Sequence, residues 1–168
     1  PVWFVDIWGV VHNGVSDFEH TTEVLVRHRM KGGTVVLVSN SPRSQAGVIE
    51  QLHQVGVRGD AYDTAVTSGD ATQSLMRAVP SGKLFHIGAE RDVSLFDDLP
   101  VRRVDMEDAD AIICTGLRHD TSEAPADYLA ELKALAARKL PMICANPDKV
   151  VRKGTKLLYC AGSLADAY

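Results

Sequence analysis

An α/β protein with parallel sheets is the fold class that the sequence predicts. Residues 2–5 and 34–40 form short apolar runs without polar alternation, which is typical of strands buried on both faces of a parallel sheet. Residues 21–33, between these runs, have the composition of a helix, with Thr21 or Thr22 as its cap and two glycines at its end. Strand, helix and strand in this order form a unit that crosses over right-handed into a parallel sheet.

A second alternation of strands and helices follows a seam of turn-forming residues. Before the seam, residues 44–57 and 69–79 are predicted to form helices, the latter capped by Ser68. The seam is the Pro-Ser-Gly sequence of residues 80–82. The elements predicted after it are a strand at 83–88, a helix at 90–99, a short run at 101–104, a strand at 111–116, a helix at 125–140 and a strand at 141–146. We therefore expect two successive α/β segments, one on each side of the seam.

Composition and charge are those of a soluble globular protein. Of the 168 residues, 45% are apolar and 24% are charged, and the formal net charge is -4. The sequence has no cluster of Lys and Arg that would predict binding to nucleic acid or to a membrane surface. A small molecule is therefore the expected partner. The sequence contains neither a membrane-spanning run nor a secretory signal, so we expect a cytoplasmic location; homo-oligomerisation is left open. Cys114, Cys144 and Cys160 lie in or beside apolar runs and are expected to be buried free thiols.

The ends of the first two predicted strands carry the candidate chemistry, because Asp6 ends one and Ser39, Asn40 and Ser41 end the other. In open α/β sheets, ligands bind outside the carboxyl ends of the strands. An Asp in that place can attack phosphorus and form an aspartyl phosphate, which water then hydrolyses. Mg2+ would offset the charges of carboxylate and phosphate, while Ser39 and the following backbone N–H groups would bind the phosphoryl oxygens. The alternative is that Asp6 only ends a strand and residues 39–42 only form a turn.

Two sequence motifs resemble a known family. "VWFVDIWGVVHNG" followed by "VVLVSNSPR" is similar to the first two motifs of the haloacid dehalogenase superfamily of hydrolases. More narrowly, it resembles the branch with bacterial nucleotide monophosphatases, 4-nitrophenylphosphatases and pyridoxal phosphate phosphatase. Weaker similarity continues through "YDTAVTSGDAT", "KLFHIGAE", "ICANPDKV" and "CAGSLADA", so it covers nearly the whole chain. The resemblance implies a Rossmann-like core, of which residues 1–81 form the N-terminal half, and an inserted α/β cap domain over residues 82–168.

The resemblance also implies roles for particular residues and a small phosphorylated metabolite as substrate. Asp6 would be the nucleophile and a ligand of Mg2+, and the main-chain carbonyl of Trp8 would be a second metal ligand. Ser39 and Asn40 would bind the phosphate. The cap loop that contains Asn146 and Asp148 would reach toward the leaving group and help to select the substrate.

Three further features near these motifs are less specific. Arg43 either contacts the phosphate or covers the next helix, and His12 either lines the pocket or is solvated. The string "GAERD" at residues 88–92 follows a predicted strand, as a phosphate-binding turn does, but its single glycine does not predict a dinucleotide site.

Trp8 departs from the pattern of the phosphatases in this superfamily, which carry a second Asp at that position. That Asp protonates the leaving oxygen and later activates water, whereas an indole N–H only donates a hydrogen bond. Loss of such a group typically lowers the rate by about a hundredfold to ten-thousandfold. Two competing functions therefore stay open. The expected function is a Mg2+-dependent phosphatase, and the two alternatives are a catalytically defective phosphate-binding or regulatory module and a dehalogenase-type hydrolase in which Asp6 attacks carbon.

The sequence also ends before the Lys and the acidic pair that the family places later in its core. We therefore expect a fragment that is nearly inactive by itself, because a single carboxylate holds Mg2+ poorly. In the family, later strands lie beside the first strand, so residues 2–5 are expected to form an unpaired apolar edge.

Overall fold

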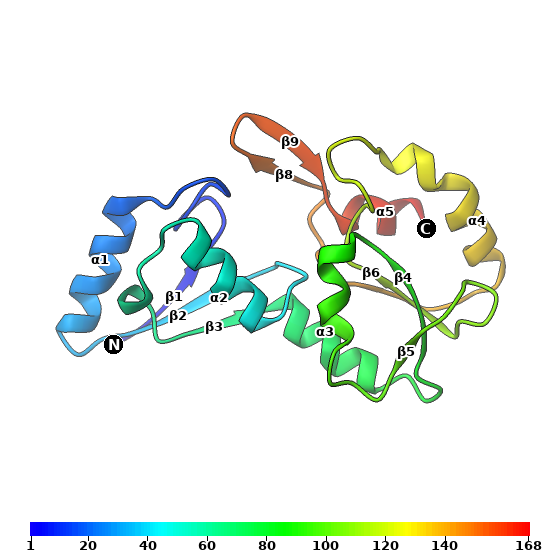
Figure 1. Cartoon of the computed structure of the whole chain (residues 1–168), viewed down its shortest axis with the longest axis horizontal. Helices are drawn as coiled ribbons and strands as arrows, with labels where there is room; N and C mark the ends of the chain where they lie inside the picture. Colours follow the sequence, from blue (N-terminus) through cyan, green and yellow to red (C-terminus); the bar gives the residue numbers. More distant parts are fainter.

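The computed structural model describes residues 1–168, which form two parallel sheets, one hairpin and the helices that cover them (Figure 1). The first sheet has the strand order β1-β2-β3, and the second has the order β5-β4-β6-β7. The hairpin β8-β9 is antiparallel. Figure 1 shows the first sheet with α1 and α2 on one side of the molecule, and the second sheet with α4 and α5 on the other.

The first sheet is built by the predicted strand, helix and strand and by one further strand. Its strands are β1 (Val2–Asp6), β2 (Thr34–Ser39) and β3 (Thr64–Thr67). The helices of this region are α1 (Glu19–Met30), α2 (Gln45–Gln54) and the short 3-10 helix η1 (Gly59–Ala61). Eleven buried residues, among them Val35, Leu37 and Leu52, form one hydrophobic cluster against a single face of this sheet.

The prediction that residues 2–5 form an edge strand is confirmed, whereas the prediction that they are buried on both faces was wrong. β1 pairs only with β2, and Val2 and Phe4 are exposed. The sheet alternates its side chains between two faces, and only one face of this sheet is packed by helices.

Two helix caps differ from the predictions. α1 begins at Glu19, two residues before Thr21, and its N-cap Phe18 makes no side-chain cap hydrogen bond. Thr22 lies inside the helix, where it is buried and its hydroxyl donates to Asp17 Oδ2 at 3.5 Å. α3 (Ser68–Arg77) is capped by Thr67 rather than by Ser68, because the Thr67 hydroxyl accepts the Asp70 N–H at 3.1 Å. Both errors shift a boundary by a turn or less and leave the helix in place.

The second sheet is covered on both faces. Its strands are β4 (Lys83–Ile87), β5 (Arg102–Arg103), β6 (Ala111–Cys114) and β7 (Met142–Cys144). Alternate residues of β6 belong to two clusters: Ile112 and Cys114 pack with α4 (Leu129–Ala137) and α5 (Ala161–Ala167). Ala111 and Ile113 pack with Met76 of α3 and with Leu95.

Several elements, most of them in the second half, differ from the prediction in type or were not predicted. The segment predicted as a helix at 90–99 is the 3-10 helix η2 (Glu90–Phe96), and the helix at 125–140 begins as the 3-10 helix η3 (Pro125–Tyr128). The strand β3 and the hairpin strands β8 (Val150–Lys153) and β9 (Lys156–Tyr159) were missed. The hairpin turns at Gly154, whose φ of +58° favours glycine, and this was the available signal.

The three cysteines are free thiols, as predicted. Cys114 and Cys160 are buried, while Cys144 is only partly buried. Burial raises the pKa of the Cys114 thiol to about 12 and that of Cys160 to about 11, so neither provides a thiolate at neutral pH. None of the helices is both long enough and apolar enough to traverse a bilayer.

Candidate active site

A cavity of about 490 Å³ lies between the carboxyl ends of the two parallel sheets. Segments that follow β1, β2, β4, β6 and β7 line it, together with the hairpin β8-β9. The structure brings together in this cavity all seven residues singled out from the sequence: Asp6, Trp8, Ser39, Asn40, Arg43, Asn146 and Asp148. Sequence segments as far apart as the first and the last strand therefore meet at one site.

Asp6 and Ser39 end neighbouring strands at this edge. The register of β1 and β2 pairs Asp6 with Val38, the residue before Ser39. Asp6 Oδ1 accepts the Ile7 N–H at 2.9 Å, which fixes the carboxylate and leaves Oδ2 without a protein partner. Ser39 is buried, and its Oγ accepts the Ser41 N–H at 3.1 Å, so the hydroxyl proton is free to donate. The arrangement places an open carboxyl oxygen beside a hydroxyl donor.

The donors near Asp6 fit part of a Mg2+ site. Asp6 Oδ2 is open, and the main-chain carbonyl of Trp8 accepts no hydrogen bond. No group of three or more His, Cys, Asp or Glu side chains lies close enough to hold a metal ion. Mg2+ is often held by one or two carboxylates plus waters and phosphate oxygens, so these two donors suit it but do not complete its coordination.

The side chain of Trp8 joins the two halves of the molecule. Its Nε1–H donates to the Arg152 carbonyl of β8 at 2.8 Å. Gly14, with a φ of +83°, packs so closely on the indole that an added Cβ would lie 2.5 Å from the ring. The indole therefore holds the hairpin beside the cavity.

His12 lines the cavity but is not placed to act as a base. It is buried, and its Nδ1 accepts the Gly14 N–H at 2.8 Å, which leaves the proton on Nε2. Burial lowers the pKa of His12, so the neutral ring is favoured. The imidazole is held as a neutral donor.

The predicted phosphate-binding amide and the predicted cap loop contact each other. Asn40 Nδ2 donates to Asp148 Oδ2 at 2.5 Å, and the Asp148 N–H donates to Asn146 Oδ1 at 3.0 Å. One Nδ2 proton of Asn40 is used by Asp148, and the second remains available to a phosphate oxygen. The contact closes one end of the cavity.

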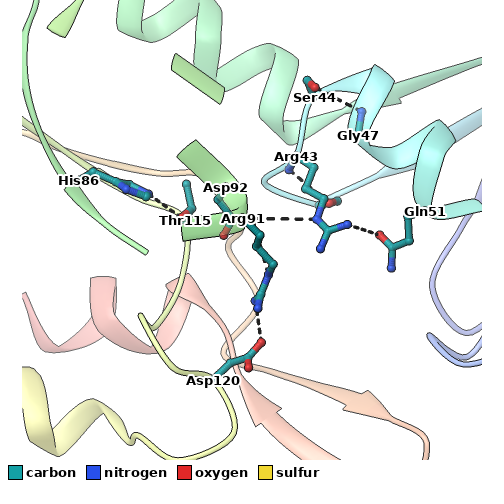
Figure 2. Close-up of polar contacts among 10 residues, drawn as sticks. Arg43, Ser44, Gly47, Gln51, His86, Arg91, Asp92, Thr115 and Asp120 are labelled. Carbon is teal, nitrogen blue, oxygen red and sulfur yellow. Dashed lines mark hydrogen bonds and ion pairs between the residues drawn. The ribbon is translucent and has the colours of Figure 1, made fainter. Parts of the chain in front are cut away.

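Four charged residues of the cavity were missed by the sequence analysis: Arg91, Asp92, Asp120 and Lys153. Figure 2 shows Asp92 of η2 facing Arg43, whose Nε lies 4.0 Å from Asp92 Oδ1. Arg91 Nη2 donates to Asp120 Oδ2 at 2.6 Å, and the Arg91 Nε lies 3.9 Å from Asp92 Oδ1. The string "GAERD" was the available signal, because it follows the carboxyl end of β4.

Fold and cavity define the class of protein. It is an α/β protein with a Rossmann-like sheet whose carboxyl edge faces a second α/β unit across a polar cavity. The family model of haloacid dehalogenase-like hydrolases matches residues 3–102, and the chain belongs to this family. The predicted fold, a partial Rossmann-like core with an α/β cap, is confirmed.

Solved structures agree with this assignment. A haloacid dehalogenase-like hydrolase from Brucella suis is 47% identical, superposes with a TM-score of 0.95 and is matched over 98% of this chain and 60% of its own length. A p-nitrophenyl phosphatase from Archaeoglobus fulgidus is 22% identical, with a TM-score of 0.76 over 99% of this chain and 62% of its own. A glycerol phosphate phosphatase from Mycobacterium tuberculosis, in complex with magnesium, is 22% identical, with a TM-score of 0.73 over 99% of this chain and 50% of its own.

The chain therefore spans between half and two thirds of the length of these relatives. The two phosphatases share its fold. No protein with a curated description matches the sequence significantly.

Proposed function

We propose that the protein containing this chain hydrolyses a small phosphorylated metabolite, with Asp6 as the nucleophile. The observation that carries the proposal is the open Oδ2 of Asp6 at the carboxyl edge of β1, in one cavity with Ser39. The shared fold of two phosphatases supports phosphorus rather than carbon as the atom attacked. The division into a core half, residues 1–81, and a cap, residues 82–168, is part of this proposal.

Each of these cavity residues would have a separate role in the reaction. Asp6 Oδ2 attacks phosphorus, and the bond to the leaving oxygen breaks to give an aspartyl phosphate and an alcohol. The Ser39 hydroxyl and the guanidinium of Arg43 hold the phosphoryl oxygens during the transfer. Water then attacks the aspartyl phosphate and releases phosphate and free Asp6.

Mg2+ would be held by Asp6 and the Trp8 carbonyl, and it would supply positive charge against the phosphoryl oxygens. Because these 168 residues supply only one carboxylate to the ion, we expect the isolated chain to bind Mg2+ weakly and to turn over little substrate. The full-length protein is thus the right material for assays.

Two other functions remain as competitors. The Trp8 side chain, bonded to Arg152, favours a phosphate-binding module without turnover, because it fills the place of the usual acid. A dehalogenase-type hydrolase is the second competitor, because Asp6 could equally attack carbon.

The test is an assay of the full-length protein on 4-nitrophenyl phosphate, an alkyl phosphate and a 2-haloalkanoate, with Mg2+ and with EDTA. The proposal expects Mg2+-dependent phosphate release that Asp6→Asn abolishes. Asp60→Asn is the matched control, because Asp60 is on the surface, pairs with Arg58, and neither residue lines the cavity. Phosphate binding without turnover would favour the binding module, and halide release alone would favour the dehalogenase.

A further inference from the structure

We propose that Asp92, on the 3-10 helix η2, is the proton donor to the leaving oxygen, in place of the acid that Trp8 does not supply. The inference rests on the proposed function, because it assigns a residue to that reaction. It gives a catalytic role to the second half of the chain, which otherwise only closes the cavity.

The position of Asp92 is the first reason. Its side chain is 4% exposed, yet it lines the same cavity as Asp6. It follows the carboxyl end of β4, so it approaches the cavity from the edge of the second sheet, opposite the edge that carries Asp6. A leaving group bonded to phosphorus at Asp6 would extend toward that second edge.

The electrostatic surroundings of Asp92 are the second reason. Burial raises the pKa of the carboxyl, whereas Arg91, Arg43 and a hydrogen bond from the Thr115 hydroxyl lower it. Asp120, which also faces it, raises it, and the net pKa is above the ordinary value. A carboxyl balanced in this way gains or loses its proton when one neighbouring cation moves.

Arg43 is the cation that a substrate would move. Its Nε is 4.0 Å from Asp92, and it sits in the loop after Ser39, where a phosphoryl group would bind. A phosphate dianion that draws the guanidinium toward itself weakens the stabilisation of the Asp92 anion and adds negative charge nearby. Substrate binding therefore favours the protonated form of Asp92, which takes up a proton from solvent.

The Thr115 side chain lies beside Asp92 in the cavity, on the side of the second sheet. Figure 2 shows the Thr115 hydroxyl between Asp92 and His86, whose Nε2 is 2.9 Å from Thr115 Oγ1. Gly88 makes this approach possible, since an added Cβ would lie 1.8 Å from Thr115 Oγ1. Burial lowers the pKa of His86 to about 4, so the ring is neutral and does not itself supply a charge to Asp92.

The other titratable groups of the cavity are less suited to the role. Asp148 is exposed and accepts a hydrogen bond from Asn40, and Asp120 is paired with Arg91 at 2.6 Å. His12 is a neutral donor whose Nδ1 is occupied. Among these groups, only Asp92 combines burial with contact to a movable cation.

Asp6 Oδ2 forms a bond to phosphorus while the bond from phosphorus to the leaving oxygen breaks, and the Asp92 proton goes to that oxygen. In the second half, water forms the new bond to phosphorus and the bond to Asp6 breaks. The protons of the attacking water remain with the released phosphate and solvent, and Asp92, now a carboxylate, regains its proton from solvent and returns to its starting form.

The test compares leaving groups in the full-length protein. An alkoxide needs a proton as it leaves, whereas 4-nitrophenolate is a stable anion and does not. We expect Asp92→Asn to lower kcat by about a hundredfold or more for alkyl phosphates, and only slightly for 4-nitrophenyl phosphate. Asp120→Asn is the matched control, because it removes the same charge beside Arg91, and it should affect both substrates by the same factor.

The second-site variant Trp8→Asp, made together with Asp92→Asn, restores an acid at the position that the family uses. Recovery of alkyl phosphate turnover relative to Asp92→Asn alone would support the inference. Equal slowing of both substrates by Asp92→Asn would overturn it, because that is the result of a purely structural role near Arg43.

A pH profile of the unmodified protein keeps the inference testable should Asp92→Asn fail to fold. The alkyl phosphate rate should fall at alkaline pH as an acid is lost, while the rate with 4-nitrophenyl phosphate should not share this limb. Identical profiles for the two substrates would contradict the role of Asp92. Absence of turnover of either substrate would instead contradict the proposed function itself.

Discussion

The two parallel sheets of the chain differ in how many of their faces are covered. In the second sheet, alternate residues of β6 enter two separate hydrophobic clusters, one on each face. In the first sheet, one face packs on α1 and α2, and the other exposes Val2, Phe4, Val38 and Val66. Parallel sheets normally bury both faces. The first sheet lacks a covering layer on one face among these 168 residues.

The two regions also provide different groups to the cavity. In the proposed reaction, the first region would supply the nucleophile and the phosphate donors from an open, one-sided sheet, and the second would supply Asp92 and the closing loops from a sheet with its own core. The exposed apolar face agrees with the expectation that the chain is a piece of a longer protein, because the relatives extend beyond it.

The largest expected effect comes from the packed faces of both sheets. Leu37 and Ile113 are fully buried, one in each region. Leu37→Ala and Ile113→Ala should each lower the free energy of unfolding by about 2–5 kcal/mol, because each leaves a cavity in a close-packed cluster. Urea unfolding followed by circular dichroism measures both. A cost below about 1 kcal/mol at Leu37 would mean that the one-sided sheet is loosely packed.

The next effect is a loss of stability of the second region in acid. Burial, with help from Arg103 and Arg118, lowers the pKa of His86 from 6.5 to about 4, so protonation favours the unfolded chain. Above pH 6.5, His86 does not lower the free energy of unfolding. As pH falls from 6.5 toward 4, protonation of His86 in the unfolded chain lowers that free energy by about 3 kcal/mol at most. His86→Gln should keep the contact with Thr115 and flatten this part of the pH profile. An unchanged profile would show that His86 is not held in its neutral form.

A smaller effect is expected at the contact between the regions. Trp8→Phe removes the hydrogen bond of 2.8 Å to the Arg152 carbonyl and should cost about 1 kcal/mol. Hydrogen exchange of residues 150–159 should accelerate, because the hairpin loses its attachment to the first region. Trp3→Phe is the control, since Trp3 stacks on His28 at 3.7 Å and lies away from the hairpin. Equal exchange in the two variants would contradict a role of Trp8 in holding the regions together.

The smallest effect is expected on the uncovered face. Phe4 is 74% exposed, so Phe4→Ser should change the stability of this chain by less than about 0.5 kcal/mol. The same substitution in the full-length protein gives the decisive comparison. A large cost there, and none here, would identify this face as a surface that other residues of the protein bury.

The sequence predicted which residues meet in one cavity better than it predicted the coverage of the sheets. Asp6 and Ser39 follow strands whose apolar runs are short and unbroken, and parallel pairing necessarily brings the ends of such strands to one edge. The motifs around them identified the family. Asp92 escaped notice because a carboxylate in a short 3-10 helix has no periodic pattern, and its role depends on Arg43, which lies 49 positions earlier in the printed sequence.

What the sequence by itself determined is the order of most strands and helices, the placing of Asp6 and Ser39 at one sheet edge, and the family. These follow from local apolar periodicity and short motifs, which are properties of neighbouring residues. Only the tertiary structure decided which faces are buried, that Trp8 binds the hairpin, and that Asp92 meets Arg43. Burial and pairing at these positions depend on segments far apart in the chain, and no local pattern encodes the distance between them.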